Sequence, residues 1–312
     1  MIRLGLIGCG EHAEVGHAIS LARYVAAHPG QIELTAACDV QLSRARTFCQ
    51  KYGFKNAYAS AKEMLDTVKI DGCITAVPPE RIAEVGASLL QLGIPCVVEK
   101  PLGTSLREVA FLVDVAKATG TPNMVSVNRR FMPFLNRALN WSRSIGPMRY
   151  VRCTMTRHAR REPEFLWTTA IHAVDALRYI AGEVSDSSLR TIRGDALASW
   201  HAIDLRFNSG TYGHIDVLPT TGLIEETYDL YGEDFQASVT SPFGTQRLVR
   251  CFRNKELALE EIAGDDMPED VLSGFYAETE EFIRAIREGD APHPAIEDVA
   301  TSVTLCLKMA NN

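Results

Sequence analysis

Residues 2–13, IRLGLIGCGEHA, decide the fold of this chain. The first six form a short apolar run typical of a buried strand, and Gly8 ends it. Helical spacing of apolar residues follows over Ala13–Ala27. A strand, a glycine-rich turn and a helix in this order indicate the start of a parallel α/β unit.

The alternation of strand and helix continues for about 120 residues. We expect further strands at Ile32–Cys38, Gly72–Val77, Cys96–Val98 and Met124–Val127, and helices at Arg44–Tyr52, Ala61–Thr67, Ile82–Leu92 and Leu106–Thr119. Strands that alternate with helices of this length pair in parallel through right-handed crossovers. The fold class is therefore α/β, with an N-terminal Rossmann domain over residues 1–123.

The pattern changes after Asn123. Segments that alternate apolar and polar residues predict strands, and Gly, Asn, Asp and Pro separate them. Strands are expected at Met148–Arg157, Trp200–Phe207, Tyr212–Leu218, Thr227–Tyr231, Ala237–Thr240 and Leu248–Phe252, with helices at Pro133–Arg143, Thr168–Ala181, Val271–Arg287 and Ala295–Met309. Residues 124–312 are thus predicted to form an α+β domain with a mostly antiparallel open sheet.

Composition excludes several classes of protein. The net charge of −7 argues against a nucleic-acid surface, and no apolar run is long enough to cross a bilayer. Strand-like sequence begins at Ile2, so we expect no signal peptide. The eight cysteines are scattered singly, which predicts reduced thiols in a cytoplasmic protein, with neither disulfides nor a metal site.

The turn Gly8-Cys9-Gly10-Glu11-His12-Ala13 suits the pyrophosphate of a dinucleotide. Gly8 permits the tight turn, Gly10 lets the backbone approach phosphate, and Ala13 lets helix pack on strand. Asp39, at the end of the second strand, can accept both ribose hydroxyls and would repel a 2′-phosphate. NAD is therefore favoured, although Arg44 nearby leaves NADP open.

A second motif, Glu99-Lys100-Pro101, ends a later strand of the same sheet. Lys100 could hydrogen-bond a substrate hydroxyl and stabilise developing alkoxide charge, or it could pair only with Glu99 and fix the strand end. Its position at the carboxyl end of a strand, where ligands of such sheets bind, favours the first role. A cis Lys100–Pro101 bond is also a hypothesis.

These motifs, taken in order, make the chain resemble the glucose–fructose oxidoreductase / inositol dehydrogenase (Gfo/Idh/MocA) family over nearly its whole length. The resemblance rests on the glycine turn, Asp39, Glu99-Lys100-Pro101, Asn128-Arg129-Arg130-Phe131 with Pro133, His172-Ala173-Val174-Asp175 and Phe207-Asn208-Ser209-Gly210.

The resemblance implies an NAD-dependent enzyme that oxidises a secondary alcohol of a sugar, cyclitol or related polyol, or runs the reverse reduction. Lys100 and His172 are the expected catalytic residues. The cofactor is expected to contact Gly8–Ala13, Asp39, Val77, Pro78, Glu99, Lys100, Asn128 and Arg129, and the substrate Lys100, Arg157, Thr168, Thr169 and His172. A homodimer or homotetramer through the second sheet is also implied.

His172 is the expected proton carrier, since histidine titrates near neutrality. Thr168, His172, Asp175 and Tyr179 lie at positions i, i+4, i+7 and i+11 and share one polar stripe of the predicted helix. The alternative is a histidine that only satisfies a domain interface. The basic run Arg157–Arg161 could bind a carboxylate or phosphate of the substrate, or be a solvated loop.

Two departures from the family pattern concern the proton chemistry. Many catalytic members have an aspartate four residues before this histidine, where the chain has Thr168, and a histidine where it has Ile82. Threonine cannot hold the charge that raises the pKa of a neighbouring histidine. The rival interpretation is therefore a non-catalytic regulator of the same fold that binds a dinucleotide or sugar.

Overall fold

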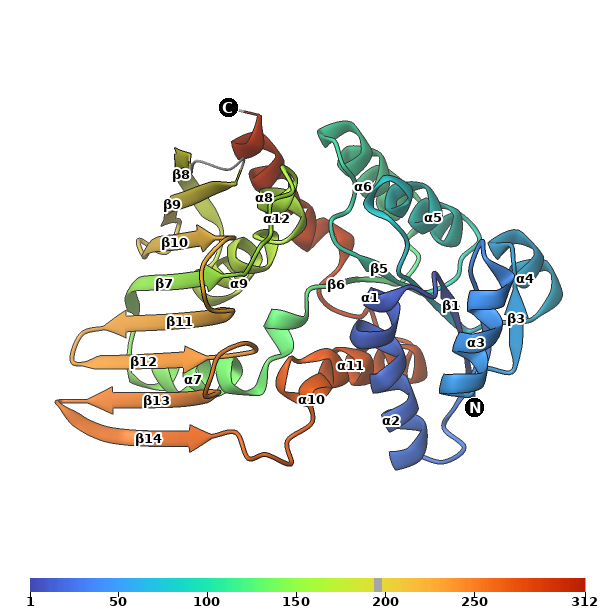
Figure 1. The fold of residues 1–312 in the computed structure, drawn as a ribbon, viewed down its shortest axis with the longest axis horizontal. Coiled ribbons are helices and arrows are strands. Elements are labelled where there is room, and N and C mark those ends of the chain that lie inside the picture. Colours follow the sequence, from blue (N-terminus) through green and yellow to red (C-terminus); the bar gives the residue numbers. More distant parts are fainter. Residues whose placement is uncertain (194–197, 312) are drawn as a thin grey trace. The chain divides into compact units, whose positions relative to one another are not determined.

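The computed structural model describes residues 1–193 and 198–311, which divide into two compact units (Figure 1). Unit 1 comprises Met1–Val127 and Phe275–Thr304, and unit 2 comprises Asn128–Gly274 with the segment from Leu305 onward. The boundary expected after residue 123 differs from this division. The strand Asn123–Ser126 pairs with its neighbour in the first sheet, and residues 275–304 pack with the N-terminal segment.

Unit 1 contains a six-stranded parallel sheet, which includes the five strands that the sequence predicts and a short strand, Asn56–Tyr58, that was not predicted. Its order is β3-β2-β1-β4-β5-β6. The chain therefore fills one side of β1 first and then crosses to the other, which creates a crevice beyond the carboxyl ends of β1 and β4. The strands are β1 (Ile2–Ile7), β2 (Ile32–Cys38), β3 (Asn56–Tyr58), β4 (Gly72–Thr75), β5 (Cys96–Glu99) and β6 (Asn123–Ser126).

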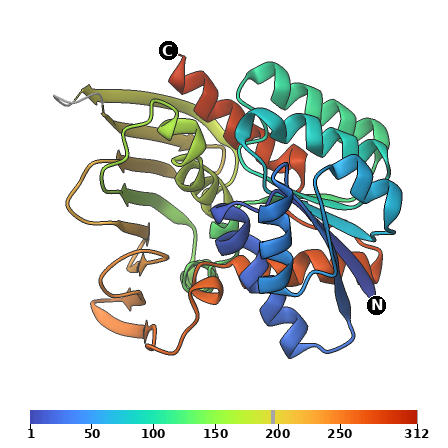
Figure 2. The same ribbon diagram turned by 45° about the vertical axis from the view of Figure 1, so that its right-hand side comes forward.

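Helices cover both faces of this sheet. Figure 2 shows α2 and α11 on one side and α5 and α6 on the other, as right-handed crossovers require. Buried apolar side chains of β1, β4 and β5, such as Leu4, Ile74 and Val97, fill the space between sheet and helices. The helices are α1 (Glu11–Ala13), a π-helical turn (Glu14–Ala18), α2 (Ile19–Ala27), α3 (Leu42–Tyr52), α4 (Ala61–Thr67), α5 (Pro79–Gln91), α6 (Leu106–Thr119) and α11 (Phe275–Glu288).

Unit 2 contains an eight-stranded mixed sheet. Its order is β14-β13-β12-β11-β7-β10-β9-β8, and all neighbours are antiparallel except β10 and β7. The strands are β7 (Met148–Thr156), β8 (Val184–Arg193), β9 (Ser199–Phe207), β10 (Tyr212–Leu218), β11 (Glu225–Gly232), β12 (Phe235–Thr240), β13 (Leu248–Arg253) and β14 (Glu256–Ile262).

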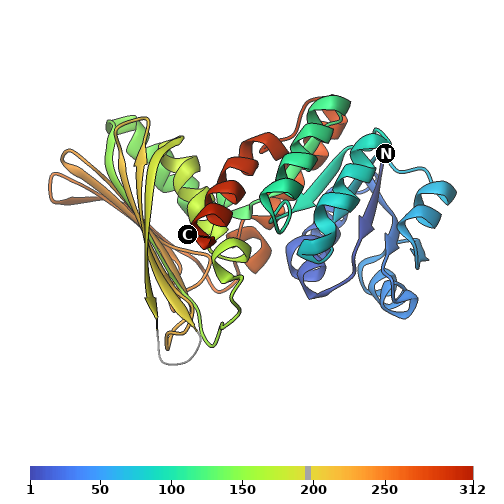
Figure 3. The ribbon, with the colours of Figure 1, turned by 90° about the horizontal axis from the view of Figure 1, so that it is seen from above.

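Helices of unit 2 lie on one face of its sheet (Figure 3). Val151, Cys153 and Met155 of β7 are fully buried on that face, while Arg152 on the opposite face is exposed. This alternation is the pattern that the sequence predicts for a sheet covered on one side. The helical segments are the 3₁₀ turn Asn128–Phe131, α7 (Pro133–Ile145), α8 (Phe165–Thr168), α9 (Ile171–Ala181) and α10 (Glu269–Leu272); α12 (Ile296–Ala310) begins in unit 1 and ends in unit 2.

Several predicted elements need correction. The helix expected over Thr168–Ala181 is two helices, α8 and α9, and the helix expected over Val271–Arg287 is also divided, into α10 and α11. The second break occurs at Gly274, which has φ of +86° and packs so closely that a Cβ would lie 2.3 Å from the carbonyl oxygen of Asn128. A residue in this conformation ends a helix.

All eight cysteines are free and buried. Burial raises the pKa of Cys9 and Cys96 to about 12 and of Cys38 to about 11. These thiols are packing groups and not nucleophiles. Among the described residues, no helix is long and apolar enough to cross a membrane.

Candidate functional site

The glycine turn has the backbone that its sequence predicts. Gly8 has φ of +96°, and a Cβ there would lie 2.2 Å from the carbonyl oxygen of Ala76, so only glycine fits. A Cβ placed on Gly10 would have no neighbouring atom within 4 Å. Gly10 is also the N-cap of the helix, and no side chain caps it. The turn therefore presents uncapped N–H groups next to open space, as an anion site requires.

Asp39 joins this turn to the end of β2. Its Oδ2 accepts a hydrogen bond from the backbone N–H of Cys9 at 3.0 Å, and its Oδ1 accepts one from Gln41 at 2.9 Å. The side chain is buried, and the guanidinium of Arg44 lies 3.5 Å from Oδ2. Oδ1 accepts only one of these hydrogen bonds and therefore retains a lone pair that can accept a further donor.

Glu99 is held by two histidines of the glycine-turn helix. Its Oε1 lies 2.7 Å from Nε2 of His17 and 3.0 Å from Nε2 of His12. Burial alone would raise the pKa of this carboxyl group, but the two imidazoles hold it well below its usual range. Glu99 is therefore a buried carboxylate.

A π-helical turn explains how both histidines reach one oxygen. In an α-helix, residues five apart differ by about 140° in direction around the axis. The π turn Glu14–Ala18 has i→i+5 geometry, in which five residues complete about one turn. His12 and His17 therefore face the same side. His17 was not predicted as a site residue, because α-helical spacing does not connect it with His12.

Lys100 follows Glu99 directly at the end of β5 and is half-buried. Its backbone N–H lies 3.2 Å from Oε2 of Glu99, and the Lys100–Pro101 peptide bond is cis, as hypothesised. At the end of the neighbouring strand β4, Val77 is half-buried and Pro78 is exposed just before α5.

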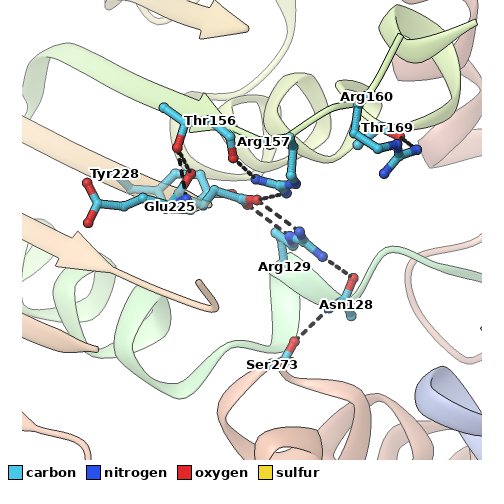
Figure 4. Close-up of polar contacts among 10 residues, drawn as sticks. Asn128, Arg129, Thr156, Arg157, Arg160, Thr169, Glu225, Tyr228 and Ser273 are labelled. Carbon is cyan, nitrogen blue, oxygen red and sulfur yellow. Dashed lines mark hydrogen bonds and ion pairs between the residues drawn. The ribbon is translucent and has the colours of Figure 1, made fainter. Parts of the chain in front are cut away.

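In unit 2, Arg129 and Arg157 share one buried carboxylate (Figure 4). Nε and Nη2 of Arg129 each donate to Glu226 at 2.9 Å, and Nη2 of Arg157 donates to the same group at 2.5 Å. The hydroxyl of Tyr228 adds a fourth donor at 2.5 Å. Burial opposes ionisation of Glu226, but the two guanidinium groups lower its pKa to about 2.

This cluster also fixes Asn128. Arg129 Nη1 donates to Oδ1 of Asn128 at 3.0 Å, and the amide nitrogen of Asn128 donates to the carbonyl of Ser273 at 2.7 Å (Figure 4). The exposed ring of Phe243 lies against the guanidinium of Arg157, 4.6 Å from its centroid. Neither Glu226 nor Phe243 was predicted as a site residue. Glu226 lies 97 residues from Arg129 along the chain, so sequence spacing does not connect them.

The candidate proton carrier His172 is buried in the first turn of α9. The break before α9 overturns the predicted continuous stripe, since Thr168 belongs to α8 and its hydroxyl donates to the carbonyl of Glu164 at 2.8 Å. Asp175 forms a two-fold ion pair with Arg130, at 2.8 and 2.7 Å. Its carboxylate is thus part of the packing of α9 on the 3₁₀ turn.

Comparison with known proteins identifies the family. Residues 2–128 match the family described as an oxidoreductase family with an NAD-binding Rossmann fold, Gfo/Idh/MocA. The N-terminal part of the chain belongs to the Gfo/Idh/MocA oxidoreductase family. Both the family and the α/β architecture predicted from the sequence are confirmed.

Relatives of this family member include dehydrogenases. The rhizopine catabolism protein MocA of Rhizobium meliloti is 26% identical over 58% of the chain, and the match spans 57% of that protein. The myo-inositol 2-dehydrogenase of Thermotoga maritima is 24% identical over 95% of the chain and 92% of its own length. The rival prediction, a non-catalytic regulator, finds no support among these relatives.

A solved structure shows the same fold. An oxidoreductase from Agrobacterium radiobacter, in complex with NAD⁺, L-tartaric acid and magnesium, superposes with a TM-score of 0.83 at 17% identity. The match covers 100% of this chain and 96% of that one.

Proposed function

We propose that the chain is an NAD-dependent dehydrogenase that transfers hydride between nicotinamide and a secondary alcohol or ketone of a sugar, cyclitol or related polyol. The observation that carries this proposal is the 3.0 Å contact between His12 and Glu99. It joins the helix of the glycine turn to the residue before Lys100. A lysine beside the expected cofactor site is placed for alcohol oxidation.

The residues at the ends of β1 and β2 fit a dinucleotide. The open space at Gly10 and the uncapped helix start suit the pyrophosphate, and Asp39 can accept the ribose hydroxyls. We propose NAD as the preferred cofactor, because the buried carboxylate of Asp39 would repel a 2′-phosphate. The NAD⁺ held by the Agrobacterium oxidoreductase supports this choice.

Bound nicotinamide would supply the hydride acceptor or donor. Lys100 would donate a hydrogen bond to the substrate oxygen and stabilise its developing negative charge. His172 would accept the hydroxyl proton during oxidation and return it during reduction. The guanidinium of Arg157 binds Glu226, so we propose only an indirect role for Arg157 in substrate binding. Exposed residues next to it would contact the substrate. The activity named for the myo-inositol relative supports a polyol substrate.

The test is a Lys100→Met variant assayed with NAD and a panel of polyols, sugars and sugar acids. We expect kcat/KM to fall about 10²- to 10³-fold, with NAD affinity within about threefold of the parent. Lys117→Met is the matched control, since Lys117 is exposed on the same unit and pairs only at 3.6 Å with Glu297. Full activity of Lys100→Met would overturn the assignment.

Cofactor choice is tested by titration of NAD and NADP, followed by fluorescence. We expect NAD to bind more tightly, and Asp39→Ser to reduce that preference. Because Asp39 also accepts the N–H of Cys9, thermal unfolding of the variant must accompany the titration. Equal affinity of the parent protein for both cofactors would contradict the NAD assignment.

We also propose that the chain forms a homodimer or homotetramer through the uncovered face of the eight-stranded sheet, and that it is cytoplasmic. That face carries the stacked rings of Tyr150 and Tyr212, with centroids 5.9 Å apart, and Tyr231 beside them. Aromatic side chains of this kind are enriched at interfaces. Light scattering of the parent and of Tyr150→Glu tests the surface, and a monomeric parent protein would refute it.

A further inference from the structure

A cavity of about 410 Å³ lies within unit 2. Its walls come from residues 160–166, from the sheet strands β8 and β9, and from Met309 and Ala310 at the end of α12. The volume is in the range of small-molecule sites. None of the residues that carry the proposed hydride transfer lines it.

Two arginines contribute to the wall of this cavity. Arg160 and Arg161 both line it and follow Ala159, whose φ is +55°. Arg160 is engaged, because its guanidinium pairs with Glu162 and donates to the hydroxyl of Thr169 at 3.3 Å (Figure 4). The guanidinium of Arg161 has no ion pair or hydrogen bond with any residue in the described ranges. Arg160 and Glu162 offset each other, so Arg161 leaves one net positive charge at the cavity.

The sheet side supplies neutral hydrogen-bonding groups. Thr191 of β8 and His201 of β9 are cross-strand partners, with the hydroxyl 3.1 Å from Nδ1 of the imidazole. Burial lowers the pKa of His201 below its ordinary value of 6.5, so the ring is neutral at pH 7. Ser199 lines the same wall. These groups can orient a ligand without adding charge.

The remaining wall is apolar. Phe165, Leu166 and Met309 are each at most 5% exposed, and Leu189 and Pro219 complete the lining. A sugar would leave many hydroxyl groups facing such a wall without partners, which is unfavourable. A ligand with an apolar carbon chain and one anionic group would match both the apolar wall and the charge of Arg161.

We propose that this cavity binds a small organic carboxylate. Arg161 forms the ion pair with the carboxylate, Thr191 and His201 orient it, and the apolar wall covers its carbon chain. A carboxylate–guanidinium pair with two parallel hydrogen bonds is the strong form of this contact. The carboxylate is either the acid group of the enzyme's own substrate or that of a separate effector, and the same side chains serve both.

Titration of the full chain with hexanoate, by calorimetry at low salt, tests the site. We expect a Kd of about 1 mM or lower, and binding at least about tenfold weaker for hexan-1-ol, which lacks the charge. Arg161→Gln is expected to weaken hexanoate binding about tenfold or more. Arg190→Gln is the matched control, since it removes an exposed arginine from the next position to Leu189 and Thr191 on β8, whose side chain faces the other way.

Two outcomes overturn the proposal: no hexanoate binding by the parent protein, or equal affinities in the parent and Arg161→Gln. Circular dichroism checks that each variant is folded. Inhibition kinetics with an active polyol then distinguish the sources: competition by hexanoate assigns the carboxylate to the substrate, and a non-competitive effect or activation assigns it to an effector. Because binding is measured without NAD, its failure is separate from any failure of the proposed dehydrogenase activity.

Discussion

Each unit contains a buried carboxylate that binds two basic side chains, Glu99 in unit 1 and Glu226 in unit 2, but the two clusters differ in chemistry. Glu226 binds two guanidinium groups and a phenol, whereas Glu99 binds two imidazoles and a backbone N–H. Guanidinium groups stay charged at every working pH, while histidine can lose its proton near neutrality. The comparison separates a cluster of permanently charged arginines from one built on two imidazoles, next to the proposed hydride-transfer residue.

The largest expected effect is that of Glu226→Gln. Two buried arginines lose their shared counter-charge, so the free energy of unfolding should fall by about 3–5 kcal/mol. Urea unfolding at pH 7, followed by circular dichroism, measures it. The control is Glu260→Gln, which breaks the exposed pair with Arg250 and should cost less than about 1 kcal/mol. Equal losses in the two variants would remove the distinction between buried and exposed pairs.

The contribution of Glu226 should also depend on pH with a defined sign. Its pKa is lowered from 4.5 to about 2 on folding, so the stabilisation is fully present above pH 4.5 and is lost as the pH falls toward 2. This interval corresponds to about 3 kcal/mol. The difference in unfolding free energy between parent and Glu226→Gln, measured from pH 7 to pH 3, should stay constant and then shrink. A difference that grows on acidification would contradict the lowered pKa.

Glu99→Gln should have a smaller effect than Glu226→Gln, because it leaves no buried guanidinium group without a counter-charge. We expect a loss of about 1–3 kcal/mol, which reflects imperfect hydrogen bonding of buried groups. Chemical unfolding at pH 7 gives the value. A loss as large as that of Glu226→Gln would show that the loss of a guanidinium counter-charge does not distinguish the two clusters.

The smallest expected effects distinguish the two histidines. The side chain of His17 is 3% exposed and that of His12 is 53% exposed. His17→Gln should therefore cost about 1–2 kcal/mol, and His12→Gln less than about 0.5 kcal/mol. The pair of variants serves as its own control in thermal unfolding. If His12→Gln lowered the stability more than His17→Gln, the buried contact of His17 would not be the main stabilising contact of Glu99.

Much of unit 1 follows from local sequence. The glycine turn, the buried strands and their intervening helices carry short-range periodicity, and Gly8, Asp39 and Lys100 lie where that periodicity predicts. Unit 2 was less predictable at its edges. Strand β14 has one partner strand and six exposed residues out of seven, so its sequence lacks the apolar alternation of an inner strand.

The side-chain clusters were harder to predict than the elements. The spacing of His12 and His17 makes sense only with a π turn, which sequence periodicity does not reveal. The two arginine partners of Glu226 lie 69 and 97 residues away, so only the tertiary structure joins them. Arg157 was predicted to bind substrate because it belongs to a basic run, but one carboxylate buried in β11 turns it inward.

The burial of all eight thiols has a practical consequence for spectroscopy. Native cysteines that are inaccessible and un-ionised react slowly with maleimides. Cysteines could be introduced at Lys62 in unit 1 and at Ser185 in unit 2, both of which are exposed. Maleimide dyes would then label these two cysteines almost exclusively. Energy transfer between the two dyes could follow the separation of the units during cofactor binding in the otherwise unaltered protein.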